Sequence, residues 1–95
     1  MANKEQEFEW DEQKNIKNQE KHGIRFEDAI PVFDNDMLIE IDNRFDYGEI
    51  RCKAIGKTIA VYFTVIYTER GEKIRIISAR KSHKKEKVKY DNYYS

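Results

Sequence analysis

The sequence of 95 residues has few of the features that build cross-linked, metal-bound or membrane-spanning structures. Cys52 is its only cysteine, which excludes an intramolecular disulfide and leaves no common set of structural zinc ligands. The N-terminal stretch is too polar for a secretory signal, and no apolar run approaches the length needed to span a bilayer. We therefore expect one small domain over residues 1–95, located in the reducing cytoplasm and working without a metal or other cofactor.

The sequence also lacks a net charge, because 18 lysines and arginines balance 18 acidic residues. A zero net charge argues against simple nucleic-acid binding. The charges are nevertheless separated along the chain, since residues 1–49 carry six basic and fourteen acidic side chains, whereas residues 50–95 carry twelve and four. This asymmetry indicates either a polyanionic partner for the second half or two halves that neutralise each other within the fold.

Glycines are few, and three of the four outline a sheet. Gly48, Gly56 and Gly71 separate segments that are rich in β-branched and aromatic residues. Such segments predict a three-stranded antiparallel meander with short hairpins at the glycines. A further strand is expected over residues 36–42, before the meander.

Helices are expected before these strands. Asp11 suits the N-cap and Gly23 the C-terminal cap of a helix over residues 11–22, although Ile16 is the only strong hydrophobe within it. A second, short helix follows, in which Pro31 must lie near the first turn. Its predicted apolar face has the spacing i, i+3, i+4, i+7 and consists of Phe26, Ala29, Ile30 and Phe33.

A third helix is expected after the last strand, with Ser82 as its N-cap and tyrosines on one side. The predicted order is a short strand, two helices, four strands and a helix. The fold class is therefore α+β, with two N-terminal helices and a C-terminal helix packed on a twisted antiparallel sheet.

Seven short segments carry a resemblance to a known family. In these segments and in their order the chain resembles the BrnT family of bacterial type II toxins. The segments are FEWDEQK (8–14), KHG (21–23), FEDA (26–29), VFD (32–34), YGEIR (47–51), YTERG (67–71) and IRIISARK (74–81). The chain departs from the family at Pro31, where an unbroken helix is usual.

The resemblance implies a small ribonuclease toxin with a RelE-like fold that inhibits translation by cleaving RNA. It also implies a partner, a cognate BrnA antitoxin with a ribbon-helix-helix DNA-binding segment. The complex of the two would repress its own operon, so operator DNA would be bound only through the antitoxin complex. Two other functions stay open, namely a nucleic-acid-binding module without catalysis and an antitoxin-binding co-repressor.

Cleavage of RNA without a metal requires a base, an acid and cationic donors for the charge that develops on the phosphate. Arginine suits the cationic role because its planar fork binds phosphate oxygens and never deprotonates. Strand alternation predicts that Arg80 ends the largely apolar face of Ile74, Ile76 and Ser78, where it either pairs with an internal acid or points into a cleft.

Other candidate catalytic residues each have a structural alternative. Glu49 and Arg51 share one face of a neighbouring stretch and are a candidate base and charge stabiliser, or else a plain salt bridge. His22 titrates near neutrality and is a candidate base or acid, but a histidine in the last turn of a helix also serves as a cap. Tyr90 is placed to donate a proton or stack on a base, or it anchors the last helix to the sheet.

Basic residues crowd the predicted start of the last helix, where the helix dipole disfavours cations. A bound phosphate would instead meet backbone N–H groups and lysines together. We expect these residues to bind the RNA backbone or an acidic surface of the antitoxin. The residues at the helix start are Lys81, His83, Lys84 and Lys85, and Lys53, which shares the face of Glu49 and Arg51, is a further predicted RNA-binding residue.

Overall fold

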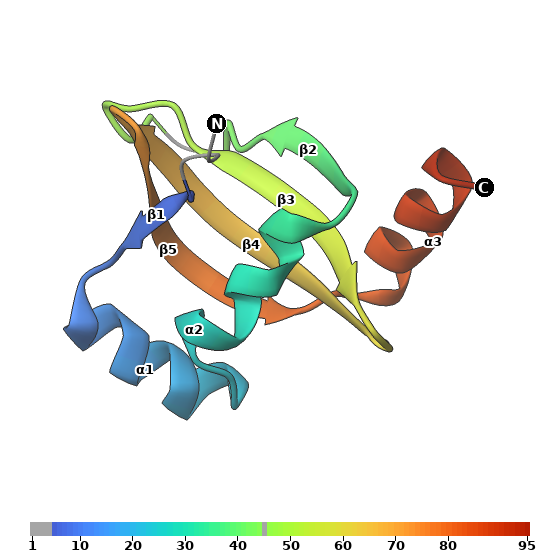
Figure 1. Ribbon diagram of the computed structural model, residues 1–95, viewed down its shortest axis with the longest axis horizontal. Coiled ribbons are helices and arrows are strands. Elements are labelled where there is room, and N and C mark those ends of the chain that lie inside the picture. The colour runs from blue at the N-terminus through green and yellow to red at the C-terminus, as the bar shows by residue number, and fades with distance from the viewer. Residues whose placement is uncertain (1–4, 45) are drawn as a thin grey trace.

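The structure is a computed structural model that describes residues 5–44 and 46–95. It is α+β, with a five-stranded mixed sheet of order β1-β5-β4-β3-β2 and helices that pack against it (Figure 1). The elements in chain order are β1 (Glu7–Glu9), α1 (Glu12–His22), α2 (Phe26–Ala29), the 3₁₀ helix η1 (Ile30–Asp34), β2 (Met37–Ile41), β3 (Cys52–Thr58), β4 (Val61–Arg70), β5 (Lys73–Lys81) and α3 (Lys84–Tyr93).

The expected antiparallel sheet is correct for four of the strands and wrong for the first. β2, β3, β4 and β5 pair antiparallel, as the predicted meander requires, but β1 pairs parallel with β5, with Phe8 opposite Ile74. Tight turns force neighbouring strands to run antiparallel. No tight turn joins β1 to β5, because most of the chain lies between them, so the pattern of hairpins does not fix the direction of β1.

The hairpin predicted at Gly56 is also wrong. β3 continues through Gly56, and the chain turns three residues later, at Ile59 and Ala60. A Cβ atom at position 56 would lie 2.5 Å from Cγ1 of Val32 in η1. The glycine therefore allows η1 to approach β3 closely, and it does not mark a turn.

The first helix begins and ends as predicted, but it docks through polar side chains. The Asp11 carboxylate accepts a hydrogen bond from the backbone N–H of Gln13, and Gly23 ends the helix at φ 74°. Asn15 and Asn18 are buried, whereas Ile16 is exposed. The Asn18 amide donates to the backbone oxygen of Ala79 at 2.8 Å and accepts from its N–H at 3.2 Å, which fastens α1 to the edge of β5 that β1 leaves open.

The second helix is short, as expected, because it changes to a 3₁₀ helix at Ile30, beside Pro31. The fully buried residues are Phe26, Ala29 and Val32, which recur every three residues. A 3₁₀ helix has that period, so Val32 takes the central place predicted for Ile30 and Phe33. These residues pack on the sheet face that carries Val65, Ile76 and Ala79.

A β-bulge in β5 changes the predicted direction of Arg80. Ser78 pairs with Ile66 and Ile76 pairs with Tyr67, so Ile77 has no opposite residue. The extra residue reverses the alternation, and Ile76 and Ala79 both face the core. Arg80 therefore does not end the face of Ile74 and Ile76, but points to the opposite face of the sheet.

α3 lies against this opposite face, because its Glu86 reaches Thr64 and Arg80, which alternate with the core residues of β4 and β5. Its N-cap is His83, not the predicted Ser82. Ser82 is buried and its hydroxyl lies 2.7 Å from that of Thr64. That contact holds Ser82 at the sheet, so the helix begins one residue later than predicted.

Candidate functional site

The buried carboxylate of Glu86 binds cationic side chains on the sheet face that lies opposite the core. Arg80 binds it through its two terminal guanidinium nitrogens, with Nη1 2.7 Å from Oε1 and Nη2 2.9 Å from Oε2. Nζ of Lys53 lies 2.8 Å from Oε2. The Thr64 hydroxyl and the His83 backbone N–H donate to Oε1 at 3.1 and 2.8 Å. One carboxylate thus fixes two cationic side chains.

Sheet register brings these groups together. Lys53 on β3 is two residues from Ile55, which lies opposite Thr64 on β4, and Thr64 in turn lies opposite Arg80 on β5. Glu86 is the third residue of α3, so its carboxylate accepts the backbone N–H of the N-cap His83 in a capping arrangement. The same carboxylate starts the helix and binds the sheet.

The charges of this cluster keep Glu86 ionised. Burial alone would raise the pKa of its carboxyl, but hydrogen bonds from Arg80, Lys53 and the His83 backbone hold that pKa well below its usual range. The side chain of Glu86 is 9% exposed, whereas those of Arg80 and Lys53 are 26% and 30% exposed. The two cations therefore remain partly accessible while their counter-ion is not.

Arg80 and Lys53 open into a cleft of about 440 Å³. Four basic side chains line it against two carboxylates, and one of the carboxylates, Asp42, is already held by Arg44 through two hydrogen bonds of 2.8 and 3.0 Å. The cleft is thus suited to an anion. Its lining consists of Lys21, His22, Glu40, Ile41, Asp42, Asn43, Arg44, Lys53, Ile66, Ser78 and Arg80.

His22 lies at the wall of this cleft, at the end of α1. Burial, followed by electrostatic repulsion from the basic side chains of Lys21, Arg80 and His83, lowers the pKa of His22 below its ordinary 6.5. The imidazole is therefore neutral at pH 7 and has a nitrogen that can accept a proton. Position and protonation state both suit a base beside a bound phosphate.

The structure places other predicted residues outside the cleft lining. Glu49 and Arg51 do contact each other, with 3.1 Å between Oε2 and Nε, and Arg70 approaches Glu49 at 3.4 Å. The Arg51 guanidinium also lies 3.8 Å from the centre of the Tyr47 ring. The pair exists as the sequence suggested, beside Cys52 and Thr68 and apart from Arg80.

Tyr90 is buried between α3 and the sheet. Its hydroxyl donates to the backbone oxygen of Asp36 at 3.1 Å, and its ring meets Tyr62 edge to face at 5.8 Å. These contacts match the anchoring alternative. The remaining predicted RNA-binding residues, Lys81, His83, Lys84 and Lys85, are exposed around the start of α3.

The two charge alternatives are both realised in part. Glu9 pairs with Arg75 at 2.7 Å and Glu40 with Lys89 at 2.6 Å, so the acidic and basic halves of the sequence do neutralise each other at these places. The cleft and the exposed lysines of α3 keep an excess of positive charge. Charge separation along the sequence therefore becomes partial separation in space.

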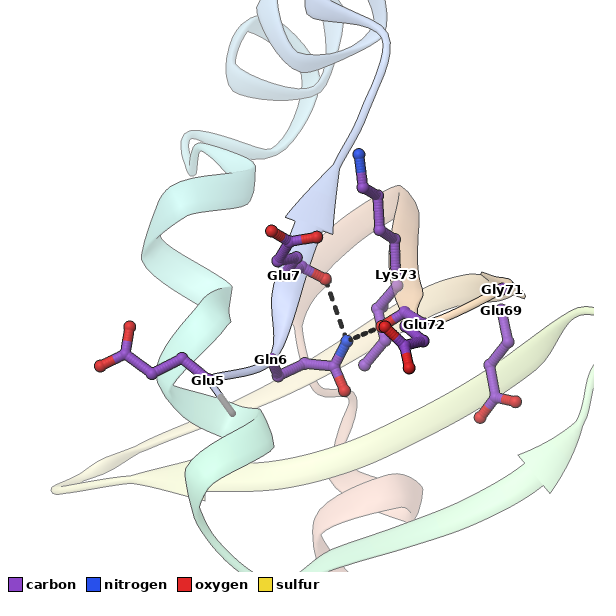
Figure 2. Close-up of a pocket in the computed structure, with 8 residues that line it drawn as sticks. Glu5, Gln6, Glu7, Glu69, Gly71, Glu72 and Lys73 are labelled. Atoms are coloured by element: carbon purple, nitrogen blue, oxygen red, sulfur yellow. Dashed lines mark hydrogen bonds between the residues drawn. The ribbon is translucent and has the colours of Figure 1, made fainter. Parts of the chain in front are cut away.

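A second hollow, of about 380 Å³, lies where β1 meets the β4–β5 turn and has the opposite character (Figure 2). Its lining includes Glu5, Glu7, Glu69 and Glu72 and one lysine, Lys73. The Gln6 amide there donates to the backbone oxygens of Glu7 and Glu72. This many carboxylates would repel a phosphate chain, which leaves the cationic cleft as the candidate site for a polyanion.

Sequence reasoning missed Glu86, Lys21 and Arg44. A glutamate three residues after a polar residue at the start of a helix is a capping signal, and that spacing from His83 could have indicated Glu86. Lys21 and Arg44 carry no comparable signal, because only the complete fold brings the end of α1, which packs on β5, and the segment after β2 to the same cleft.

Within residues 5–44 and 46–95, no group of three or more histidine, cysteine, aspartate or glutamate side chains is arranged to hold a metal ion. None of the helices in this described part of the chain is long and apolar enough to cross a membrane.

Comparison with known proteins connects the chain to a family. A family model described as the ribonuclease toxin BrnT of type II toxin-antitoxin systems matches residues 10–86. No curated protein sequence matches the chain. The matched range contains every residue of the Glu86 cluster and of the cleft.

Proposed function

The chain belongs to the BrnT family of ribonuclease toxins of type II toxin-antitoxin systems, and we propose that it cleaves RNA in the cleft beside Glu86. The proposed cleavage does not require a metal ion. The observation that carries the proposal is the pairing of Arg80 and Lys53 on one buried carboxylate, next to a neutral histidine. In this reading the scissile phosphate binds where the two partly exposed cations open into the cleft.

Each step of the reaction has a candidate group. His22 takes the proton of the 2′-hydroxyl, and the freed oxygen attacks the adjacent phosphorus. Arg80 and Lys53 donate hydrogen bonds to the phosphate oxygens that gain charge in the transition state. The bond from phosphorus to the 5′-oxygen breaks, and that oxygen takes a proton from water in the open cleft. The products are a 2′,3′-cyclic phosphate and a 5′-hydroxyl.

Glu86 is a positioning residue in this mechanism. Its carboxylate fixes the guanidinium plane of Arg80 and the ammonium of Lys53, so neither cation must be ordered when RNA binds. The exposed Lys81, Lys84 and Lys85 would then hold neighbouring phosphates of the strand. The catalytic roles predicted for Glu49, Arg51 and Tyr90 stay predictions, and the proposed mechanism does not use them.

The biological setting completes the proposal. Residues 1–95 act as one RelE-like toxin domain in the cytoplasm, where RNA cleavage inhibits translation. A BrnA-like ribbon-helix-helix antitoxin neutralises the toxin, and operator DNA is bound only through the complex. The family match supports an antitoxin partner and an RNA target.

The test is the chemistry of cleavage in a chelator. Purified toxin is incubated with RNA in EDTA, and the ends of the products are identified. We expect 2′,3′-cyclic phosphates and 5′-hydroxyls, and a matched RNA with a 2′-deoxy sugar at the cleaved position should resist. Cleavage that appears only with added Mg²⁺ would contradict the proposal, and steeply salt-dependent binding of RNA that stays intact would favour a non-catalytic binding module.

The role of His22 has a separate test in the dependence of rate on pH. Because the neutral imidazole is the active form, the rate should fall as the pH drops through the pKa of His22, which lies below 6.5. His22→Gln should be slow at every pH and should lose this acidic limb. A variant that keeps the same limb would assign the base to another group.

A further inference from the structure

The outer edge of β2 is an exposed apolar strand. β2 is the last strand on its side of the sheet, and within the part of the chain that the structure describes no strand pairs with its outer edge, the one that faces away from β3 (Figure 1). Residues Ile39 and Ile41 are 48% and 61% exposed. Proteins usually protect such edges with lysine, proline or a bulge, because an open apolar edge pairs with other chains.

At two positions of this edge, the backbone N–H and C=O groups point away from the sheet. The N–H of Asp42 donates to the oxygen of Arg51 on the β3 side at 2.8 Å. In an antiparallel ladder the bonding direction alternates, so the N–H and C=O groups of Ile39 and Ile41 point away from β3. The first part of the edge is covered, since the Tyr94 hydroxyl donates to the backbone oxygen of Met37. The open part is therefore Ile39 to Ile41.

The open part of the edge leads into the cationic cleft. Ile41 and the adjoining Glu40 and Asp42 line the cleft together with Lys53 and Arg80. A chain that paired with β2 would therefore pass from an apolar surface directly to an excess of positive charge. A segment that fits this path needs apolar side chains where it lies beside Ile39 and carboxylate side chains where it continues beyond Ile41.

We propose that β2 is the docking edge for the antitoxin. An extended antitoxin segment adds a sixth strand beside β2, covers Ile39 and Ile41 with apolar side chains, and places acidic side chains in the cleft. These carboxylates bind the same cations that a phosphate would, so docking excludes RNA from the cleft. The inference rests on the proposed function, because it takes the type II antitoxin as the occupant and the cleft as the site that must be blocked.

The experiment compares the free toxin with its complex with the antitoxin encoded in the same operon. Hydrogen exchange is measured at the amides of Ile39 and Ile41, and antitoxin affinity is measured by titration for wild type and variants. Ile39→Pro removes only an outward N–H, so the ladder to β3 stays intact. Ile39→Lys is the second variant in case proline prevents folding, and Ile59→Lys is the control, because Ile59 is an exposed isoleucine in the β3–β4 turn.

We expect slower exchange at both amides in the complex. Ile39→Pro and Ile39→Lys should bind the antitoxin at least tenfold more weakly and still cleave RNA at the wild-type rate, and Ile59→Lys should bind like wild type. Unchanged exchange, wild-type affinity of both Ile39 variants, or a free toxin that dimerises through β2 would each overturn the inference. A toxin that lacks ribonuclease activity but binds its antitoxin along β2 would refute the proposed function alone.

Discussion

Glu86 and Glu49 each lie between two cationic side chains, but in different surroundings. Glu86 is 9% exposed and receives five hydrogen bonds or ion pairs of 3.1 Å or less, from Arg80 twice, Lys53, Thr64 and the His83 backbone. Glu49 is 28% exposed and meets Arg51 and Arg70 at 3.1 and 3.4 Å. Attraction between charges is stronger where water is excluded, and an exposed pair is screened.

The difference shows what separates a preorganised site from a surface ion pair. Glu49 and Arg51 are two residues apart, so an extended chain brings them together without the rest of the fold. The Glu86 cluster requires β3, β4, β5 and α3 to be in place. Such a cluster holds its cations in fixed positions at a cleft, which is the condition for stabilising charge in a transition state. The following predictions test this distinction.

The largest effect is expected from Arg80→Ala on RNA cleavage. Loss of one positioned donor to a developing charge usually lowers the rate by about 10² to 10³. Arg75→Ala is the matched control, because Arg75 is on the same strand, has a similar exposure of 27% and pairs with Glu9. Single-turnover cleavage should fall for Arg80→Ala and stay near wild type for Arg75→Ala. Equal losses in both would show that the strand, and not the cleft, is what matters.

A smaller effect is expected from Glu86→Gln on stability. The neutral amide leaves Arg80 and Lys53 without a counter-ion, and we expect the free energy of unfolding to fall by about 2 kcal/mol, less than for a fully buried pair because both cations reach water. Urea denaturation at pH 7 measures it. Glu49→Gln should stay close to wild type in the same assay. A Glu49→Gln variant that loses as much stability as Glu86→Gln would remove the distinction between the two sites.

The smallest effect is expected when the pH is lowered, on the difference in unfolding free energy between wild type and Glu86→Gln. Because the pKa of Glu86 is lowered by folding, its contribution to stability is complete above the unfolded value of about 4.5 and is lost as the pH falls toward the folded value. The difference in unfolding free energy between wild type and Glu86→Gln should therefore shrink below pH 4.5. Denaturation curves at pH 7, 5, 4 and 3 measure this. A difference that stays constant over that range would mean that folding does not lower the pKa of Glu86.

The sequence predicted much of the fold because most of its signals were local. Asp11 and Gly23 mark the two ends of α1 through contacts with residues close to them in the sequence. Segments rich in β-branched residues indicated the strands β2 to β5. The hairpin at Gly56 and the face of Arg80 were predicted wrongly because both depend on distant residues. Gly56 makes room for Val32, and the bulge at Ile77 is visible only in the pairing with β4.

The candidate site could be predicted less fully than the fold. Arg80, Lys53 and His22 were identified by their chemistry, and the structure brings these three to one cleft. Their shared setting was not visible, because the direction of Arg80 depends on the bulge and Glu86 looked like one acid in a basic run. A buried counter-ion that joins a helix start to three strands has no short sequence pattern.

The most direct test of the account is a structure of the toxin bound to RNA with a 2′-deoxy sugar at the scissile position. We predict that the scissile phosphate lies within hydrogen-bonding distance, about 3 Å, of Arg80 and Lys53, with His22 facing the 2′ position. A scissile phosphate bound instead against Arg51 and Glu49 would contradict the account.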